Sequence, residues 1–157
     1  MTAAVSFTVP GLPVAKARPR ITTIGGRPRA FTPAKTAAYE RQVGDAARRA
    51  IGAARPLEGP LWLSVRVVVP VPASWSKTRR ERALRIDTTA PAIWPESRPD
   101  LDNYVKALCD GCNGIAWADD AQIVSLTAIK CYGTTPHVEV QAGPILPTSI
   151  EEATDDA

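Results

Sequence analysis

Five aspartates fall within the segment RPDLDNYVKALCDGCNGIAWADDAQ, which spans residues 98–122. Carboxylates repel one another, so several of them among apolar and aromatic residues are costly unless a cation neutralises them. Hard cations such as Mg²⁺ take oxygen ligands, often carboxylates together with water and phosphate oxygens. The segment therefore predicts a divalent-metal site suited to phosphodiester hydrolysis. Its acidic residues are Asp100, Asp102, Asp110, Asp119 and Asp120.

The chemistry expected of such a site is attack by a metal-activated water, because a bound ion lowers the pKa of water and neutralises transition-state charge. His137 is the only histidine, which leaves no second histidine to build a His-based general base. Lys106 lies one helical turn after Asp102 and could reach a phosphate oxygen or the leaving group. From spacing alone an alternative stays open: the aspartates only cap a helix or form a turn, and Lys106 pairs with Asp102 or Asp110.

Three local elements must position these side chains. Pro99 favours an extended Arg98, and a helix is expected from near Asn103, with Asp100 or Asp102 as its cap. A strand over residues 122–132 is rich in β-branched residues. The acidic residues would then lie at a helix start, on its polar face and at a strand start, three places that can converge. The helix is expected to bury Tyr104, Val105, Leu108 and Cys112 and to end at Gly111 or Gly114.

The string PDLDN-x-x-K, followed by D-G-x-N-G-I and W-x-DD-x-Q-I, resembles the RusA family of Holliday junction resolvases, common in phages and prophages. The resemblance extends to GRPR at 26–29, FTP at 31–33 and SWSK at 74–77, and it covers roughly residues 5–142. The sequence departs from the family pattern at Cys112, where an aliphatic residue is expected.

The resemblance implies residue roles, a cofactor and a substrate. Asp100, Asp102 and Asp120 match the Mg²⁺ ligands of the family, with Mn²⁺ able to substitute, and Lys106 matches an assisting lysine. Asp119 adjoins the third ligand without being assigned. The implied enzyme is a homodimeric endonuclease that cuts two strands of a four-way DNA junction symmetrically, leaving 5′-phosphate and 3′-hydroxyl ends. A different class also stays open: a non-catalytic protein that binds branched DNA and uses the acidic cluster structurally.

Charge is unevenly distributed along the chain. Residues 1–98 hold 17 Lys/Arg and 6 Asp/Glu, whereas residues 99–157 hold 2 and 10. A basic first part suits attraction of phosphates, and an acidic second part suits metal binding. Solvated surface is the alternative for each basic residue. The residues expected to contact DNA are Arg18, Arg20, Arg27 and Arg29, with Lys16 beside them on a loop or loose hairpin, and Lys77, Arg79, Arg80 and Arg82 on a short helix.

The fold class expected is α+β, with a mixed sheet of four to five strands, two main helices and a short basic helix. Strands are predicted at 5–9, 61–69 and 137–142, and the apolar stretch 61–69 should be central. One helix is predicted over 32–55, with Thr32 as cap and Pro33 at its first position. The second main helix is the one expected from near Asn103. The short basic helix is 77–85, capped by Ser76, where Trp75 either stacks on a base or anchors the helix. The stripe expected to be buried on helix 32–55 is Tyr39, Val43, Ala47, Ala50, Ile51 and Ala54.

The 157 residues, 45% hydrophobic and 22% charged, are expected to form one globular domain over 1–142 and a disordered acidic tail over 143–157. Without a membrane-length apolar run or a signal pattern, the protein is expected in the cytoplasm of a bacterial host. Cys109-x-x-Cys112 could join Cys131 and His137 in a zinc site. The pair lies inside an amphipathic helix rather than on a turn, however, which favours buried, reduced cysteines.

Overall fold

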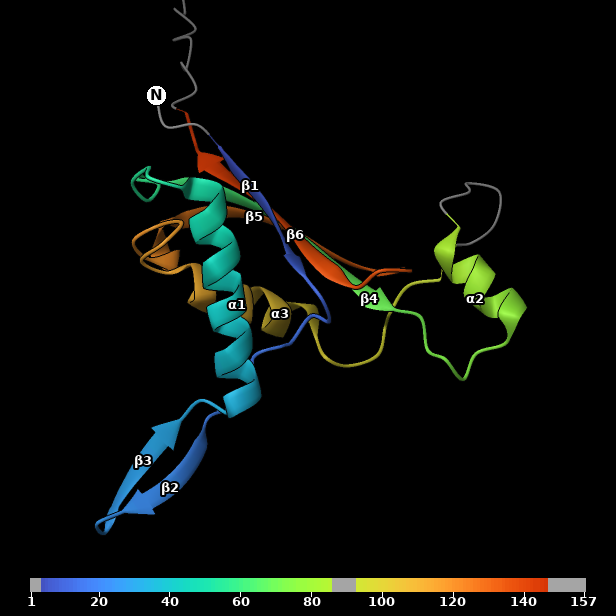
Figure 1. The fold of residues 1–157 in the computed structure, drawn as a ribbon, viewed down its shortest axis with the longest axis horizontal. Coiled ribbons are helices and arrows are strands. Elements are labelled where there is room, and N and C mark those ends of the chain that lie inside the picture. Colours follow the sequence, from blue (N-terminus) through green and yellow to red (C-terminus); the bar gives the residue numbers. More distant parts are fainter. Residues whose placement is uncertain (1–3, 86–92, 147–157) are drawn as a thin grey trace, which may run out of the picture.

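The computed structural model describes residues 4–85 and 93–146. Four strands form one mixed sheet in the order β1 (Val5–Pro10), β6 (His137–Pro144), β4 (Leu61–Pro70) and β5 (Ile123–Gly133). The β4–β5 pair is parallel, and the other two pairs are antiparallel. Helices α1 (Ala34–Ile51) and α3 (Leu101–Cys112) cover one face of this sheet (Figure 1). The α+β prediction, including a central strand at 61–69, is confirmed.

Two elements project from this body on different sides (Figure 1). One is a two-stranded antiparallel ribbon, β2 (Arg20–Ile24) with β3 (Arg27–Phe31). The other is the short helix α2 (Lys77–Leu84), in which the Ser76 side chain accepts a hydrogen bond from the Arg79 amide. The hairpin, one of the two forms expected for this basic segment, and the predicted Ser76 cap are therefore both present. A 3₁₀ turn, η1 (Asp120–Gln122), precedes β5.

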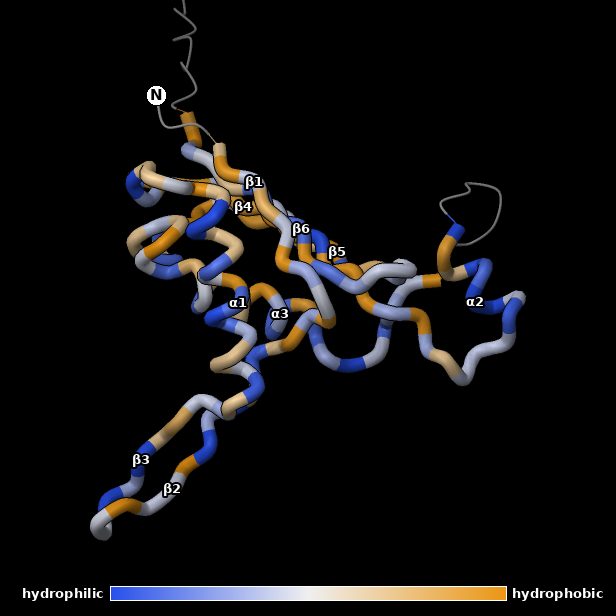
Figure 2. Tube along the Cα trace, viewed as in Figure 1, coloured by the Kyte–Doolittle hydropathy of each residue, from blue (hydrophilic) through white to orange (hydrophobic). Residues whose placement is uncertain are grey.

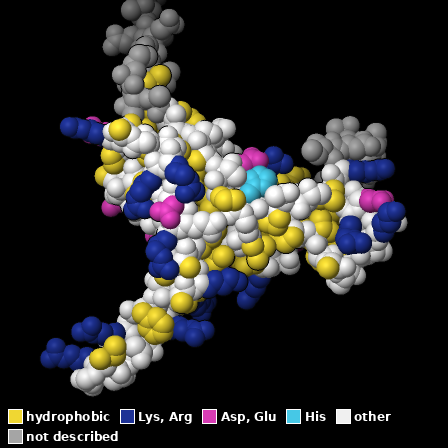
Figure 3. Space-filling view, in the orientation of Figure 1, with side chains coloured by type: hydrophobic (Ala, Val, Ile, Leu, Met, Phe, Trp, Pro, Cys, Tyr) yellow, Lys and Arg dark blue, Asp and Glu magenta, His cyan; other side chains and the backbone are white. Residues whose placement is uncertain are grey.

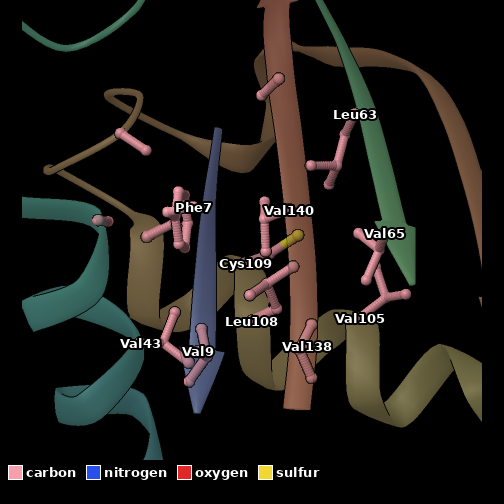
Figure 4. Packing of buried hydrophobic residues seen from close by; sticks show 14 of the residues in the cluster. Phe7, Val9, Val43, Leu63, Val65, Val105, Leu108, Cys109, Val138 and Val140 are labelled. Carbon is pink, nitrogen blue, oxygen red and sulfur yellow. The ribbon is translucent and has the colours of Figure 1, made fainter. Parts of the chain in front are cut away.

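The core lies between the sheet and the two helices (Figure 4). Apolar residues alternate along β1, β4 and β6, so that one face of each strand is buried, as a half-covered sheet requires. Hydrophobic segments of the trace accordingly gather where the helices meet the sheet (Figure 2). Burying one such Val or Leu contributes about 1.5–3 kcal/mol. The fully buried large side chains include Trp117, Leu61, Leu63, Leu108, Val43 and Val65.

Helices α1 and α3 approach closely at two glycines. A Cβ on Gly111 would lie 2.7 Å from the Glu40 carbonyl oxygen and from Val43 Cβ, a distance that real contacts do not allow. Gly44 on α1 faces the Gly111 carbonyl, and a built Cβ there would lie 3.1 Å from that oxygen, a tight contact although not a forbidden one. Gly111 therefore serves helix packing and not the predicted cap. Gly114, with φ of 73°, supplies the left-handed residue after the helix.

Several predicted boundaries differ from the structure. Helix α1 begins at Ala34, with Pro33 as its N-cap and no side-chain cap, and it ends at Ile51, before Gly52 with a φ of 61°. The predicted cap at Thr32, the place of Pro33 at the first helical position and the extension to residue 55 are therefore wrong. Ala50 is exposed and Ala54 lies beyond the helix, although the rest of the predicted stripe is buried or half-buried. Helix α3 begins two residues before Asn103. Strand β6 continues through Pro144, into the predicted tail, and residues 147–157 lie outside the described residues.

Candidate active site and nucleic-acid interface

Asp100 and Asp102 lie at the start of α3. Asp100 is the N-cap residue by its backbone angles, but its side chain makes no capping hydrogen bond. Asp102 lies in the first turn, where the helix dipole favours a negative charge. Both side chains are exposed. The alternative that Asp100 serves only as a side-chain cap is therefore not supported.

Asp119 and Asp120 differ in what their side chains do. The Asp119 carboxylate accepts a hydrogen bond of 2.8 Å from the Ala121 amide and forms a capping box with Gln122. Gln122 Oε1 accepts from the Asp119 amide at 3.1 Å, and Gln122 Nε2 donates to the Gly59 carbonyl at 3.0 Å. Asp119 thus holds the η1 turn, which Gln122 ties to the loop before β4. Half-buried Asp120 has no side-chain hydrogen bond to the described residues.

Asp110 is neutralised by Lys16, a lysine that the sequence places among the candidate phosphate contacts. Lys16 Nζ lies 2.7 Å from Asp110 Oδ2 and also pairs with Glu40 of α1. Burial opposes protonation of Lys16, but the hydrogen bonds and charges of Asp110 and Glu40 outweigh it and raise the Lys16 pKa. Lys16 is therefore a structural cation that joins α1 to α3, and its expected role as a phosphate contact stays a prediction. The Asp110 carboxylate is correspondingly neutralised by this ion pair.

Lys106 is exposed one turn after Asp102. Within residues 4–85 and 93–146, no acidic side chain lies within 4.0 Å of its amino group. The alternative that pairs Lys106 with Asp102 or Asp110 therefore finds no support. An ammonium that has no acidic partner among the described residues can contact a phosphate oxygen.

The carboxylate of Asp120, the first residue of η1, lies near α3. Burial raises the pKa of the Cys109 thiol to about 12, the charges of Asp120 and Asp110 add to the rise, and Lys106 opposes it. The charges of Asp120 and Lys106 therefore both affect the pKa of the same residue of α3, Cys109. Lys130 of β5 donates to the Ser97 and Pro99 carbonyls at 2.9 and 2.8 Å, which fixes the segment that leads into Asp100.

The described residues contain no group of three His, Cys, Asp or Glu side chains close enough together to hold a metal ion. The three-aspartate ligand set therefore stays a prediction. The donor set nevertheless suits a hard divalent cation, because Asp100, Asp102 and Asp120 offer only carboxylate oxygens. Cys109 and Cys112 are buried and free, as predicted, and burial also raises the Cys112 pKa. Protonated, buried thiols do not suit a zinc site.

Comparison with known proteins decides the family. Residues 10–142 match the family described as Endodeoxyribonuclease RusA. The chain belongs to the RusA family. It is thus an endodeoxyribonuclease of the Holliday junction resolvase type, and RusA nucleases depend on a divalent metal and act on branched DNA. Uncharacterized protein YqaN of Bacillus subtilis (strain 168) is 34% identical over 139 residues, which are 87% of this chain and 93% of that relative.

In this RusA-family chain, Lys and Arg side chains gather on both projecting elements (Figure 3). Trp75 anchors α2: its ring lies 5.3 Å from the Tyr132 ring, edge to face, and the Arg79 guanidinium lies 3.8 Å above it. This geometry favours the anchoring alternative over base stacking. The ribbon is exposed along both strands. The exposed basic side chains are Arg20, Arg27 and Arg29 on the ribbon, Arg18 just before it, and Lys77, Arg79, Arg80 and Arg82 on α2.

The RusA motifs left three positioning residues unassigned. Gln122 was within the quoted W-x-DD-x-Q-I string, so its fixed offset from Asp119 was an available signal for a capping box. Lys16 pairs with Asp110, 94 residues later in the chain, and Lys130 donates hydrogen bonds to carbonyls about 30 residues earlier. Nothing in the sequence around either lysine indicates these partners.

No helix within the described ranges is long and apolar enough to cross a membrane.

Proposed function

We propose that this protein resolves four-way DNA junctions by Mg²⁺-dependent hydrolysis, with Asp100, Asp102 and Asp120 as the ligands of the ion. The observation that carries the proposal is how the five aspartates are divided. Asp119 caps η1 and Asp110 pairs with Lys16. The other three carboxylates have no such partner within the described residues, and free carboxylate oxygens are the ligands that a hard divalent cation takes.

The residues of the chain have separable tasks in this reaction. The ion, when bound, supplies Lewis-acid activation of water and neutralises charge at the phosphate. Lys106 donates to a phosphate oxygen or to the leaving oxygen, where negative charge develops. The Asp119–Gln122 capping box holds Asp120 in place, and Lys130 holds the backbone before Asp100. The basic projections bind the DNA backbone.

The deciding experiment is cleavage of a synthetic four-way junction with Mg²⁺, Mn²⁺, Ca²⁺ or EDTA. Mg²⁺ and Mn²⁺ should support cleavage and EDTA should abolish it. Ca²⁺ should bind with little turnover, because its looser coordination aligns water poorly. A protein that binds the junction under every condition and never cuts it would instead be the non-catalytic alternative. Stoichiometric zinc in the purified protein would contradict an oxygen-ligand site.

We also propose that the protein acts as a homodimer, in the cytoplasm of a bacterial host where branched DNA forms. A junction with two-fold symmetry needs two cuts, and each chain carries one candidate site. Strand β5 forms an edge of the described sheet and exposes Val124, Leu126 and Ile129 at 64%, 52% and 43%. Such an edge invites pairing with a second copy. Leu126→Lys should lower the mass in sedimentation equilibrium from dimer to monomer, and an unchanged mass would exclude this edge.

A further inference from the structure

The ribbon of β2 and β3 stands apart from the rest of the described fold. Every residue of both strands is exposed, including Ile21 at 75% and Ile24 at 59%. A lone two-stranded hairpin is marginally stable in water and usually needs packing on one side. This ribbon is therefore expected to gain contacts from a partner molecule.

The strand register gives the ribbon two different faces. Directly opposed residues of an antiparallel pair have their side chains on the same face. Arg20 is opposed to Phe31, Thr22 to Arg29, and Ile24 to Arg27, so all three arginines share one face, called here the arginine face. The uncharged face carries the remaining pairs, Ile21 with Ala30 and Thr23 with Pro28.

We propose that the ribbon is a DNA arm whose arginine face lies on the phosphate backbone of one duplex arm of the junction. The proposal rests on the proposed function for its substrate, and it assigns the uncharged face to the side away from DNA. The charged residues of the ribbon are all arginines, which bind backbone phosphates at any sequence, and no Asp or Glu occurs before Glu40 and no Asn or Gln before Gln42. The ribbon thus lacks the amides and carboxylates that read adenine and cytosine edges.

The root of the ribbon is fixed to the helix that carries the candidate catalytic residues. The Lys16 amide donates to the Asn103 carbonyl of α3 at 2.8 Å, and its amino group pairs with Asp110. Five residues at about 3.4 Å each make an arm roughly 17 Å long. The α3 helix lies between this arm and the basic helix α2 (Figure 1). DNA held on the arginine face is therefore placed at a set offset from Asp102 and Lys106.

The face assignment is tested with two adjacent positions, since Thr22 lies on the arginine face and Thr23 on the other. Thr22→Cys and Thr23→Cys, each in a Cys131→Ser background, are labelled with an environment-sensitive fluorophore and titrated with a four-way junction in EDTA. The label at position 22 should change its emission and the label at position 23 should not. An equal response of both labels, or a response at position 23 alone, would overturn the assignment.

The contribution of each face to junction binding is tested with two triple variants, both of which introduce glutamine. Arg20→Gln, Arg27→Gln and Arg29→Gln together should weaken junction binding by about 10²-fold near 0.1 M salt. The slope of log K against log salt should fall by about 2.7, at roughly 0.9 for each phosphate that an arginine no longer neutralises. Ile21→Gln, Thr23→Gln and Ala30→Gln alter the uncharged face and should bind within about twofold of the unaltered protein.

The outcomes separate this proposal from the proposed function. Normal junction binding by the arginine-face variant, in a protein that still cleaves junctions, would refute the arm and leave the function standing. Loss of the dimer in sedimentation, with the salt slope unchanged, would make the ribbon a protein contact and also refute it. A wild-type protein that never cleaves would refute the function, while the binding measurements in EDTA would still decide the arm.

Discussion

The Lys16 amino group lies 2.7 Å from Asp110 Oδ2, and this ion pair joins the segment before the ribbon to α3. Because Glu40 of α1 binds the same amino group, Lys16→Met would leave two half-buried carboxylates facing each other. We expect a loss of about 1–2 kcal/mol in the free energy of unfolding, between the values for exposed and buried pairs. Urea denaturation measures it.

The matched control for that variant is Lys35→Met, an exposed lysine on the same helix as Glu40, which should change stability little. Adding Asp110→Asn to Lys16→Met should restore part of the loss, because it removes one of the opposed charges. If Lys16→Met and Lys35→Met have equal stability, the ion pair makes no net contribution to the fold.

His137 predicts a small pH dependence of stability. Its hydrogen bond to Glu139, with another to the Thr135 carbonyl, raises the His137 pKa against the opposing effect of burial. A pKa that is raised in the folded state adds stability below the unfolded value of about 6.5, and this is lost as pH rises through the folded pKa. The free energy of unfolding should therefore decline slightly from pH 6 upward. His137→Gln should remove that decline. If the free energy of unfolding of this variant still declines with pH, His137 is not the cause.

Lys106 should affect turnover and not folding. Lys106→Ala should slow junction cleavage by roughly 10²-fold or more, the range for losing one charge-stabilising group. Its melting temperature should stay near that of the unaltered protein, because the side chain is exposed and has no acidic partner within the described residues. Single-turnover cleavage at saturating enzyme isolates the chemical step. Near-normal turnover would leave Lys106 as a solvated surface residue.

Helix α2 should contribute to binding and not to chemistry. Neutralising Lys77, Arg80 and Arg82 as Gln leaves Arg79 over Trp75, so the helix stays anchored. Junction binding should weaken and its salt dependence should become shallower, while cleavage recovers at high enzyme concentration. Gel shifts at several salt concentrations test this. Unchanged affinity and slope would show that α2 lies off the DNA path.

Periodicity was enough to predict α1, α3, the four strands of the main sheet and the central place of β4, because these elements bury an apolar face. The ends of the helices were harder to predict from the sequence. The C-terminus of α1 depends on Gly52 adopting positive φ, and Gly44 and Gly111 serve a contact between helices far apart in sequence. Spacing likewise placed five aspartates in one segment without dividing them, and only the resemblance to the RusA family singled out three of them. That division depends on Lys16, which is distant in sequence, and on the capping geometry at Asp119.

The most direct test of the account compares two adjacent aspartates by the rate of Mg²⁺-dependent junction cleavage. Asn caps a turn as well as Asp, so Asp119→Asn should keep the η1 geometry and most of the activity. Asp120→Asn removes a charged oxygen ligand and should abolish cleavage, as should Asp102→Asn, while junction binding persists. If Asp120→Asn cleaves at the normal rate and Asp119→Asn is inactive, the assignment of the metal site is wrong.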